Sequence, residues 1–542
     1  MRWVLAVALL LVGCSPQTVP EPAPADVTLA QTVGPSPSSQ PSPSPPPALA
    51  WGPTQSQLQQ AMDEAAQLSD EAAAGQVIVA RYDGTEPATA AQMVTDYQLG
   101  GVILFSQNIV SLDQVSATSA AVQEAVAATR PWPAMVAVDN EGGSVQRLSG
   151  DAGPWTSFPP FLSAGAASDA PDAIAAAYQA MAAELVASGI TTNFAPVADV
   201  TVGPSDLTIG TRSAGSDPQR VAQVVVAASA GFSAGGVLGS LKHFPGHGSL
   251  NVDSHLRLPV LETPTAELAT RDLVPFAAGI DAGSPMVMVG HIAVTDWDRG
   301  VPATLSSAAY SYLRDQLGFT GVAVTDALDM GALTATWSSE QIAVMALNAG
   351  ADLLLVPADV AAAHRGIMSA LADGTLSRER LTEAAGRVIA MLRWQQQLAT
   401  AATPAPVGSA GPAAQALAAA AITMVAGQCD AAVVAQTVRL QGGTAAAREA
   451  LATALATAGV EVDDRAETVV ALAYQGWSGD DADVVVALDS PYLLTGAQAG
   501  TVIVSYSDSP TSLAALAAVL TGTAEATGRL PVTVGELPAS VC

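Results

Sequence analysis

Eight short runs of β-branched and other apolar residues recur before residue 360, and alanine-rich stretches separate most of them. Runs of this length predict strands that are buried on both faces, and the alanine-rich stretches predict helices. Eight such units within residues 53–400 predict a parallel sheet closed into a (β/α)8 TIM-like barrel, so the fold class is α/β. The runs lie at 76–82, 101–105, 134–139, 191–199, 239–244, 286–293, 322–326 and 352–357.

The amino-terminal residues 1–14 predict an export signal. Arg2 precedes a short apolar run and a small residue, a pattern that is typical of a signal peptide and too short for a membrane span. The segment that ends at Cys14 resembles the lipobox of bacterial lipoproteins, in which the cysteine is lipidated. We therefore expect an exported protein anchored through Cys14 to the outer face of the bacterial cytoplasmic membrane. An ordinary signal peptide with an incidental cysteine is the alternative.

Composition also divides the rest of the chain. Residues 15–52 are rich in proline and serine and predict a disordered linker. A second break rich in proline, alanine and glycine, at 401–413, separates the barrel from a smaller α/β sandwich domain at 414–542. In an exported protein Cys429 and Cys542 are candidates for a disulfide, and the sequence leaves open whether they lie close together.

The charge balance excludes one class of partner. The chain has 49 acidic and 20 basic residues, a formal net charge of −29. Phosphate backbones and anionic lipid would repel it, so we expect no nucleic acid partner and no membrane contact other than the lipid anchor. The sequence leaves the oligomeric state open.

Ionisable residues stand where the predicted strands end. Asp139 ends the third run, Lys242 and His243 lie in the fifth, His291 lies in the sixth and Asp326 ends the seventh. Active sites of barrels lie at the carboxyl ends of the strands, so these side chains predict an active site at that face.

The segment 242–255 holds the only lysine of the chain and three of its five histidines. A zinc site is one interpretation. However, Pro245 and Gly246 disfavour the helix that would place His243 and His247 on one face, so we expect no metal. Satisfied structural histidines are a second reading. A third is general acid/base catalysis, because Asp253 lies two residues before His255 and can orient its imidazole.

Asp326 supplies the carboxylate nucleophile that such an acid/base needs. A nucleophilic carboxylate facing a proton donor is the arrangement of retaining glycosidases, although their acid/base is usually a second carboxyl group. The alternative role for Asp326 is a helix N-cap after the strand.

These residues lie in motifs that resemble glycoside hydrolase family 3, in its β-N-acetylglucosaminidase (β-N-acetylhexosaminidase) branch. The motifs run through nearly the whole barrel: 100–109, 139–148, 193–200, 209–215, 242–255, 302–306 and 325–333. Ser144 departs from this pattern, because relatives often carry a larger residue there.

The resemblance implies a retaining exo-glycosidase that needs no cofactor and cleaves amino-sugar glycans, specifically terminal β-linked N-acetylglucosamine of peptidoglycan-derived fragments. It implies Asp326 as nucleophile, His255 as acid/base and Asp253 as its orienting partner. It assigns sugar binding to Asp139, Arg147, Arg212, Lys242 and His243. A phosphorylase or β-glucosidase on the same scaffold and a non-catalytic glycan-binding lipoprotein are the alternatives.

Overall fold

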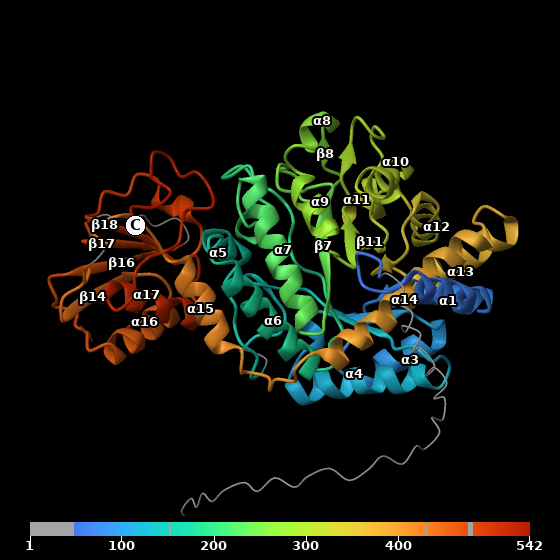
Figure 1. Cartoon of the computed structure of the whole chain (residues 1–542), viewed down its shortest axis with the longest axis horizontal. Helices are drawn as coiled ribbons and strands as arrows, with labels where there is room; N and C mark the ends of the chain where they lie inside the picture. The colour runs from blue at the N-terminus through green and yellow to red at the C-terminus, as the bar shows by residue number, and fades with distance from the viewer. Residues whose placement is uncertain (1–47, 151–152, 430, 475–480) are drawn as a thin grey trace, which may run out of the picture. The chain divides into compact units, whose positions relative to one another are not determined.

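The computed structural model describes residues 48–150, 153–429, 431–474 and 481–542. The predicted signal peptide with Cys14, and most of the predicted linker, lie outside these described residues. Pro46–Cys542 form one compact unit (Figure 1). Within the described ranges, no helix is long and apolar enough to cross a membrane.

Eight parallel strands form the barrel that the sequence predicts. Their order is β11-β9-β7-β6-β3-β2-β1-β12. The two outer strands meet through a bridge between Val324 and Leu353, and the amide of Thr325 donates to the carbonyl of Leu353 at 2.9 Å. The sheet thus closes, and the predicted barrel is confirmed. The strands are β1 (Ile78–Ala80), β2 (Gly101–Leu104), β3 (Met135–Val138), β6 (Thr192–Asn193), β7 (Leu238–Phe244), β9 (Met286–Val289), β11 (Val322–Thr325) and β12 (Leu354–Leu355).

Several strands are shorter than predicted, among them β6 and β9. The run 191–199 predicts a long strand, but β6 stops at Asn193, and Pro196 has no amide hydrogen with which to continue a ladder. The Asn193 side chain instead bonds both backbone groups of Asn140, at 2.8 Å each. Strand β9 ends at Val289, so His291 lies beyond the strand in which the sequence placed it.

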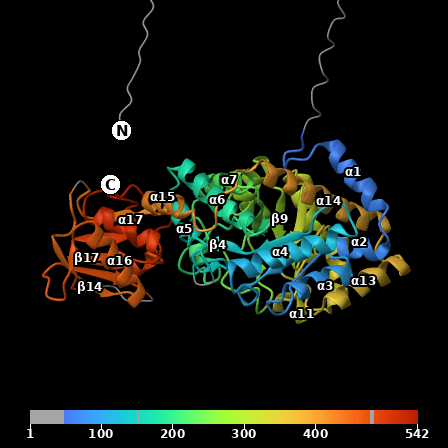
Figure 2. The ribbon, with the colours of Figure 1, turned by 90° about the horizontal axis from the view of Figure 1, so that it is seen from below.

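Helices surround the barrel, and small residues let neighbours approach closely. Figures 1 and 2 show α6 beside α7 and α1 beside α14. On α7, a Cβ at Gly231 would lie 2.4 Å from the carbonyl oxygen of Ala175 on α6, so only glycine fits there. The main helices are α1 (Gln55–Ala66), α2 (Asp70–Gln76), α3 (Pro87–Tyr97), α4 (Leu112–Ala127), α6 (Pro171–Ala187), α7 (Pro218–Ala234), α9 (Val274–Asp281), α12 (Ser339–Ala349), α13 (Val360–Asp373) and α14 (Arg378–Ala401).

A second sheet forms the smaller α/β domain, as the sequence predicts. Its order is β13-β18-β17-β16-β14-β15, and only β13 runs antiparallel to its neighbour. Alternate residues of β16 face opposite sides: Val470 and Leu472 pack into the core cluster of α16 and α17, and Ala471 and Ala473 join the cluster that includes the barrel. The elements are α15 (Gly411–Ala421), β13 (Thr423–Ala426), β14 (Thr437–Gly442), α16 (Ala445–Thr457), β15 (Glu461–Val462), β16 (Val469–Ala473), β17 (Val484–Ala487), β18 (Thr501–Val504) and α17 (Pro510–Leu520).

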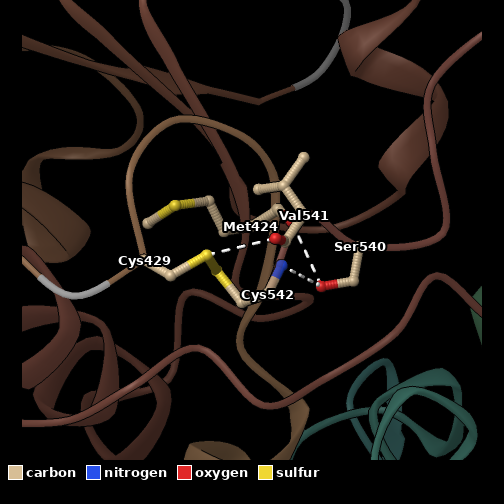
Figure 3. The surroundings of a disulfide bond; sticks show 5 residues. All are labelled: Met424, Cys429, Ser540, Val541 and Cys542. Atoms are coloured by element: carbon tan, nitrogen blue, oxygen red, sulfur yellow. Dashed lines mark hydrogen bonds between the residues drawn. A yellow bond between two sulfur atoms is a disulfide. The ribbon is translucent and has the colours of Figure 1, made fainter.

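A disulfide joins Cys429 to Cys542 (Figure 3). It fixes the last residue of the chain to the loop that follows β13. The amide of Val541 donates to the carbonyl of Met424 at 2.9 Å, which holds the same segment against the end of β13. The pairing that the sequence left open is therefore present.

Candidate active site

One cavity of about 180 Å³ opens at the carboxyl ends of the barrel strands. Seven of the eight predicted catalytic and sugar-binding residues line it, and Asp253, the eighth, bonds one of the seven. The lining seven are Asp139, Arg147, Arg212, Lys242, His243, His255 and Asp326. Residues separated by up to 187 positions in the sequence therefore meet at one site, because parallel strands present their carboxyl ends on one face.

Asp326 follows β11 and is half-buried. Its amide donates to the carbonyl of Val289 at 3.0 Å, and its Oδ1 accepts the amide of Ala327 at 2.7 Å. Burial acts to raise its pKa, but His291, His243 and the Ala327 amide together outweigh burial and hold the pKa below the ordinary value of 3.8. The carboxylate is therefore ionised at neutral pH, as a nucleophile must be.

Asp253 and His255 form a hydrogen-bonded pair at the edge of this cavity. Oδ1 of Asp253 accepts the backbone amide of His255 at 2.9 Å and lies 2.8 Å from Nδ1 of its ring. Burial raises and these two bonds lower the pKa of Asp253, with a net shift below 3.8. A proton on Nδ1 leaves Nε2 as the nitrogen that can exchange a proton with a ligand. The side chain is 67% exposed and lines the cavity.

Glu141 lies at the centre of a buried ion cluster that the sequence analysis did not single out. Its two oxygens accept hydrogen bonds from Nε and Nη2 of Arg212 at 2.9 Å each, and Oε1 lies 2.7 Å from Nζ of Lys242. Nζ of Lys242 also donates to Oδ1 of Asp139 at 2.8 Å. Burial opposes the charge on Glu141, but Arg212 and Lys242 hold its pKa far below the ordinary value. Glu141 thus fixes both cations against one wall of the cavity.

Asp199 binds His243 and His247, and the sequence analysis did not single it out either. Its Oδ1 accepts the amides of His243 and His247 at 3.1 and 2.7 Å, and its Oδ2 lies 2.7 Å from Nδ1 of His243. Nε2 of the same ring lies 3.5 Å from Nη2 of Arg212. Burial raises the pKa of Asp199, and the neighbouring histidines lower it further than burial raises it. Asp199 therefore sets which nitrogen of His243 faces the cavity.

Arg147 has a buried donor that is not used within the described part of the protein. Its Nε is buried and has no hydrogen-bond partner among the described residues. Since the side chain lines the cavity, a bound ligand with an acceptor oxygen would satisfy this donor.

The remaining histidines of the region have protein partners. Nε2 of His247 lies 3.1 Å from Oγ of Ser254, and the ring of His291 bonds Thr304 and the carbonyl of Ala327. Across the described part of the chain, no group of three His, Cys, Asp or Glu side chains is arranged to hold a metal ion.

Comparison with known proteins shows the family of the barrel. Residues 63–391 match the model described as the glycosyl hydrolase family 3 N terminal domain. The chain is similar to beta-hexosaminidase A of Pseudoalteromonas piscicida, at 34% identity over 330 residues, which are 56% of this chain and 55% of that protein. It therefore spans about half of that relative. The beta-hexosaminidase of Xanthomonas campestris pv. campestris (strain B100) is 36% identical over 318 residues, which are 58% of this chain and 92% of that protein.

A solved structure extends the likeness beyond the barrel. The glycoside hydrolase family 3 beta-N-acetylglucosaminidase from Paenibacillus sp. str. FPU-7 superposes with a TM-score of 0.76 at 28% identity. The superposition covers 86% of this chain and 99% of that one, so both sheets of the present structure have counterparts in it.

Proposed function

The chain belongs to glycosyl hydrolase family 3 and is a glycoside hydrolase, and from this premise we propose that it removes terminal β-linked N-acetylglucosamine, or a related N-acetylhexosamine, with retention of configuration. The names of its relatives support the amino-sugar specificity. One observation carries the mechanism: an ionised, half-buried Asp326 and the hydrogen-bonded Asp253–His255 pair meet at the same cavity.

In the first step, an oxygen of Asp326 attacks the anomeric carbon of the sugar. The bond from that carbon to the leaving oxygen breaks, and the protonated His255 gives its proton to the departing oxygen. A covalent glycosyl-enzyme results, with the positive charge of the imidazole removed.

In the second step, the neutral His255 takes a proton from a water molecule. The water oxygen attacks the anomeric carbon from the face that the leaving group vacated, and the Asp326 carboxylate departs. Two inversions give net retention. Asp253 keeps the imidazole oriented in both steps and stabilises its charged form.

The sugar hydroxyls and the N-acetyl group would bind the polar wall of the cavity. Asp139 accepts hydrogen bonds from sugar hydroxyls, and the donors come from Arg147, Arg212, Lys242 and His243. The cavity of about 180 Å³ suits one sugar ring, which is consistent with an enzyme that acts on chain ends.

Asp326→Asn tests the proposal directly. With p-nitrophenyl β-N-acetylglucosaminide, we expect turnover to fall by several orders of magnitude, because the amide cannot form the glycosyl-enzyme. Asp359→Asn is the matched control, since Asp359 caps α13 away from the cavity and asparagine caps equally well. Trapping with a 2-fluoro sugar should label wild-type Asp326, as mass spectrometry of the peptides would show. Unlabelled protein with normal turnover in Asp326→Asn would refute the mechanism.

The same assay separates hydrolysis from the alternatives. A phosphorylase would release N-acetylglucosamine 1-phosphate in phosphate buffer and stall without phosphate, because phosphate takes the place of water in the second step. A β-glucosidase would prefer the glucoside substrate, and a non-catalytic binding protein would turn over neither. Under the present proposal, free N-acetylglucosamine is the product with or without phosphate.

The proposed setting is the cell envelope. If Cys14 carries a lipid and the substrate is derived from peptidoglycan, the full chain expressed in a bacterium should partition into the detergent phase of Triton X-114. Cys14→Ala should move it to the aqueous phase. Aqueous partition of the unchanged chain would contradict the anchor.

A further inference from the structure

Two further cavities share no lining residue with the active cavity. One, of about 340 Å³, lies between the loop 201–211 of the barrel and residues 489–492 of the smaller domain. A neighbouring cavity of about 600 Å³ shares Asp489 and Thr211 with it, so the two are adjacent. Backbone bonds join the two domains nearby, from the amide of Ser216 to the carbonyl of Pro531 at 3.0 Å and from the amide of Arg529 to the carbonyl of Ala166 at 3.0 Å.

The smaller cavity contains two polar atoms that lack partners. Asp206 is only 5% exposed; its Oδ1 accepts the amides of Thr208 and Ile209, and its Oδ2 has no partner among the described residues. The phenol oxygen of Tyr492, which lines the same cavity, is also buried and unpartnered within the described part of the chain. Buried polar atoms are nearly always bonded, so an acceptor and a donor left free in one cavity indicate a missing occupant with both functions.

The charge of the lining restricts what the occupant is. Neither cavity is lined by a lysine, an arginine or a histidine, and the acidic side chains present are Asp206, Asp489 and Asp508. A phosphate or carboxylate ligand would meet only like charge there. The remaining polar lining consists largely of hydroxyl groups, and the larger cavity adds the aromatic rings of Phe158 and Tyr474.

We propose that these adjacent cavities form an accessory binding site for a neutral polyhydroxylated ligand, a sugar unit that is distinct from the one in the active cavity. Sugar hydroxyls donate to Oδ2 of Asp206 and to Asp489, and a sugar oxygen accepts the phenol hydrogen of Tyr492. The apolar face of the ring packs against an aromatic side chain. The site depends on neither the nucleophile nor the acid/base, so it stands or falls independently of the proposed catalytic mechanism.

Asp206 also connects this site to the active cavity. The residues whose amides it holds, Thr208 and Ile209, line the active cavity, and Arg212 follows them in the 3-10 helix η2 (Gly210–Arg212). The carboxylate of Asp206 would therefore bind a ligand through Oδ2 and hold the active-site loop through Oδ1. A substitution of Asp206 would therefore perturb both sites at once.

The test is a ligand-detected NMR titration of the full chain with N-acetylglucosamine. We expect two binding events. Tyr492→Phe, which removes only the unpartnered hydroxyl, and Asp489→Asn should each weaken the second event about three- to tenfold and leave the first unchanged. Tyr97→Phe is the matched control, because Tyr97 lines neither cavity, and should change neither event. Ser144→Trp, which places a large ring in the adjacent cavity, should block the second event without altering a buried residue.

Three results would overturn the proposal. One is a single binding event in the wild type that Tyr492→Phe and Asp489→Asn both leave unchanged. Another is a second event that survives Tyr492→Phe, Asp489→Asn and Ser144→Trp in proteins with the wild-type melting temperature. The third is displacement of the second event by lysine amide but not by a neutral polyol such as glucose, since that would assign the acidic lining to an amine.

Discussion

Nδ1 of His243 lies 2.7 Å from Oδ2 of the buried Asp199, and the opposite ring nitrogen faces Arg212 in the active cavity. With a proton on Nδ1, the Nε2 of a neutral ring is an acceptor. Through this contact, Asp199 determines whether His243 offers a donor or an acceptor to a ligand in the cavity.

Asp199→Asn should reverse that function. The asparagine oxygen can still accept the two backbone amides, but its NH2 group would face Nδ1 and favour the Nε2–H tautomer. We expect kcat/KM to fall by about 10- to 100-fold with the fold retained, and the pH profile to shift. Steady-state kinetics across pH and 15N NMR of the histidine ring provide the measurements. Asp217→Asn, a change at the cap of α7, is the control and should leave both unchanged. Unaltered kinetics in Asp199→Asn would show that Asp199 has no positioning role.

Glu141→Gln should cost stability as well as activity. It leaves Arg212 and Lys242 buried with one carboxylate fewer between them, and breaking a buried ion pair typically costs about 3–5 kcal/mol. Urea denaturation would measure the change in unfolding free energy. Glu340→Gln removes a solvent-exposed pairing with Arg365 and should give no measurable change. Equal effects of the two substitutions would contradict the central position of Glu141.

His255→Ala should slow substrates in proportion to their need for a proton. Natural glycosides have poor leaving groups and should lose far more rate than activated aryl glycosides, which depart with little protonic help. Asp253→Asn should act in the same direction and more mildly, because it disturbs the imidazole without deleting it. The measurement is kcat/KM over a series of leaving groups. An equal loss for all of them would make His255 a binding residue instead of the acid/base.

Asp272→Asn should stabilise the protein at neutral pH. The residue is fully buried, neither of its oxygens has a partner in the described structure, and Arg271 is no nearer than 3.6 Å. Burial raises the pKa of Asp272 from 3.8 to about 6, although Arg271 opposes the shift. The folded state thus binds the proton more tightly than the unfolded state, so stability falls as the pH rises from 3.8 to 6.

The size of that gain is bounded by the pKa shift. Asparagine should recover about 3 kcal/mol at most at pH 7 and almost nothing at pH 3.5, where the carboxyl is already neutral. Denaturation at both pH values tests this. A gain that is the same at both would indicate a packing effect unrelated to ionisation.

Cys542→Ser should destabilise the smaller domain. The disulfide spans 113 positions, and closing a loop of that size in the unfolded chain is worth about 2–5 kcal/mol. The lost bond should lower the melting temperature, and reduction of the wild type should have the same effect. Reduced wild type and Cys542→Ser that both melt like the oxidised protein would show that the bond contributes nothing.

The barrel could be predicted from the sequence because most of its strands are buried on both faces and read as continuous apolar runs. Strand β6 deviates where Pro196 and the side chain of Asn193 replace ladder bonds. In the smaller domain, β14 is partly polar and β15 has two residues, so neither gives the apolar signal that β16, β17 and β18 give.

The seven lining residues could be predicted because they end strands or fall in recognisable motifs. Glu141 and Asp199 could not, because their roles depend on partners 71 and 44 positions away. Both do stand inside the motifs at 139–148 and 193–200, and an acidic side chain in such a motif is the signal that could have found them.

The closure of the barrel has a consequence for how the chain is made. Strand β1 pairs with β12 across more than 270 residues, Ile78 with Leu354. During translation, β1 and β11 therefore remain unpaired sheet edges until residue 355 has left the ribosome, because β12, the strand that lies between them, has not yet been made. Open edges of this kind recruit other strands. A nascent chain that stalls before β12 is thus prone to aggregate. Once β12 has been translated, the barrel can close and no longer exposes these two edges.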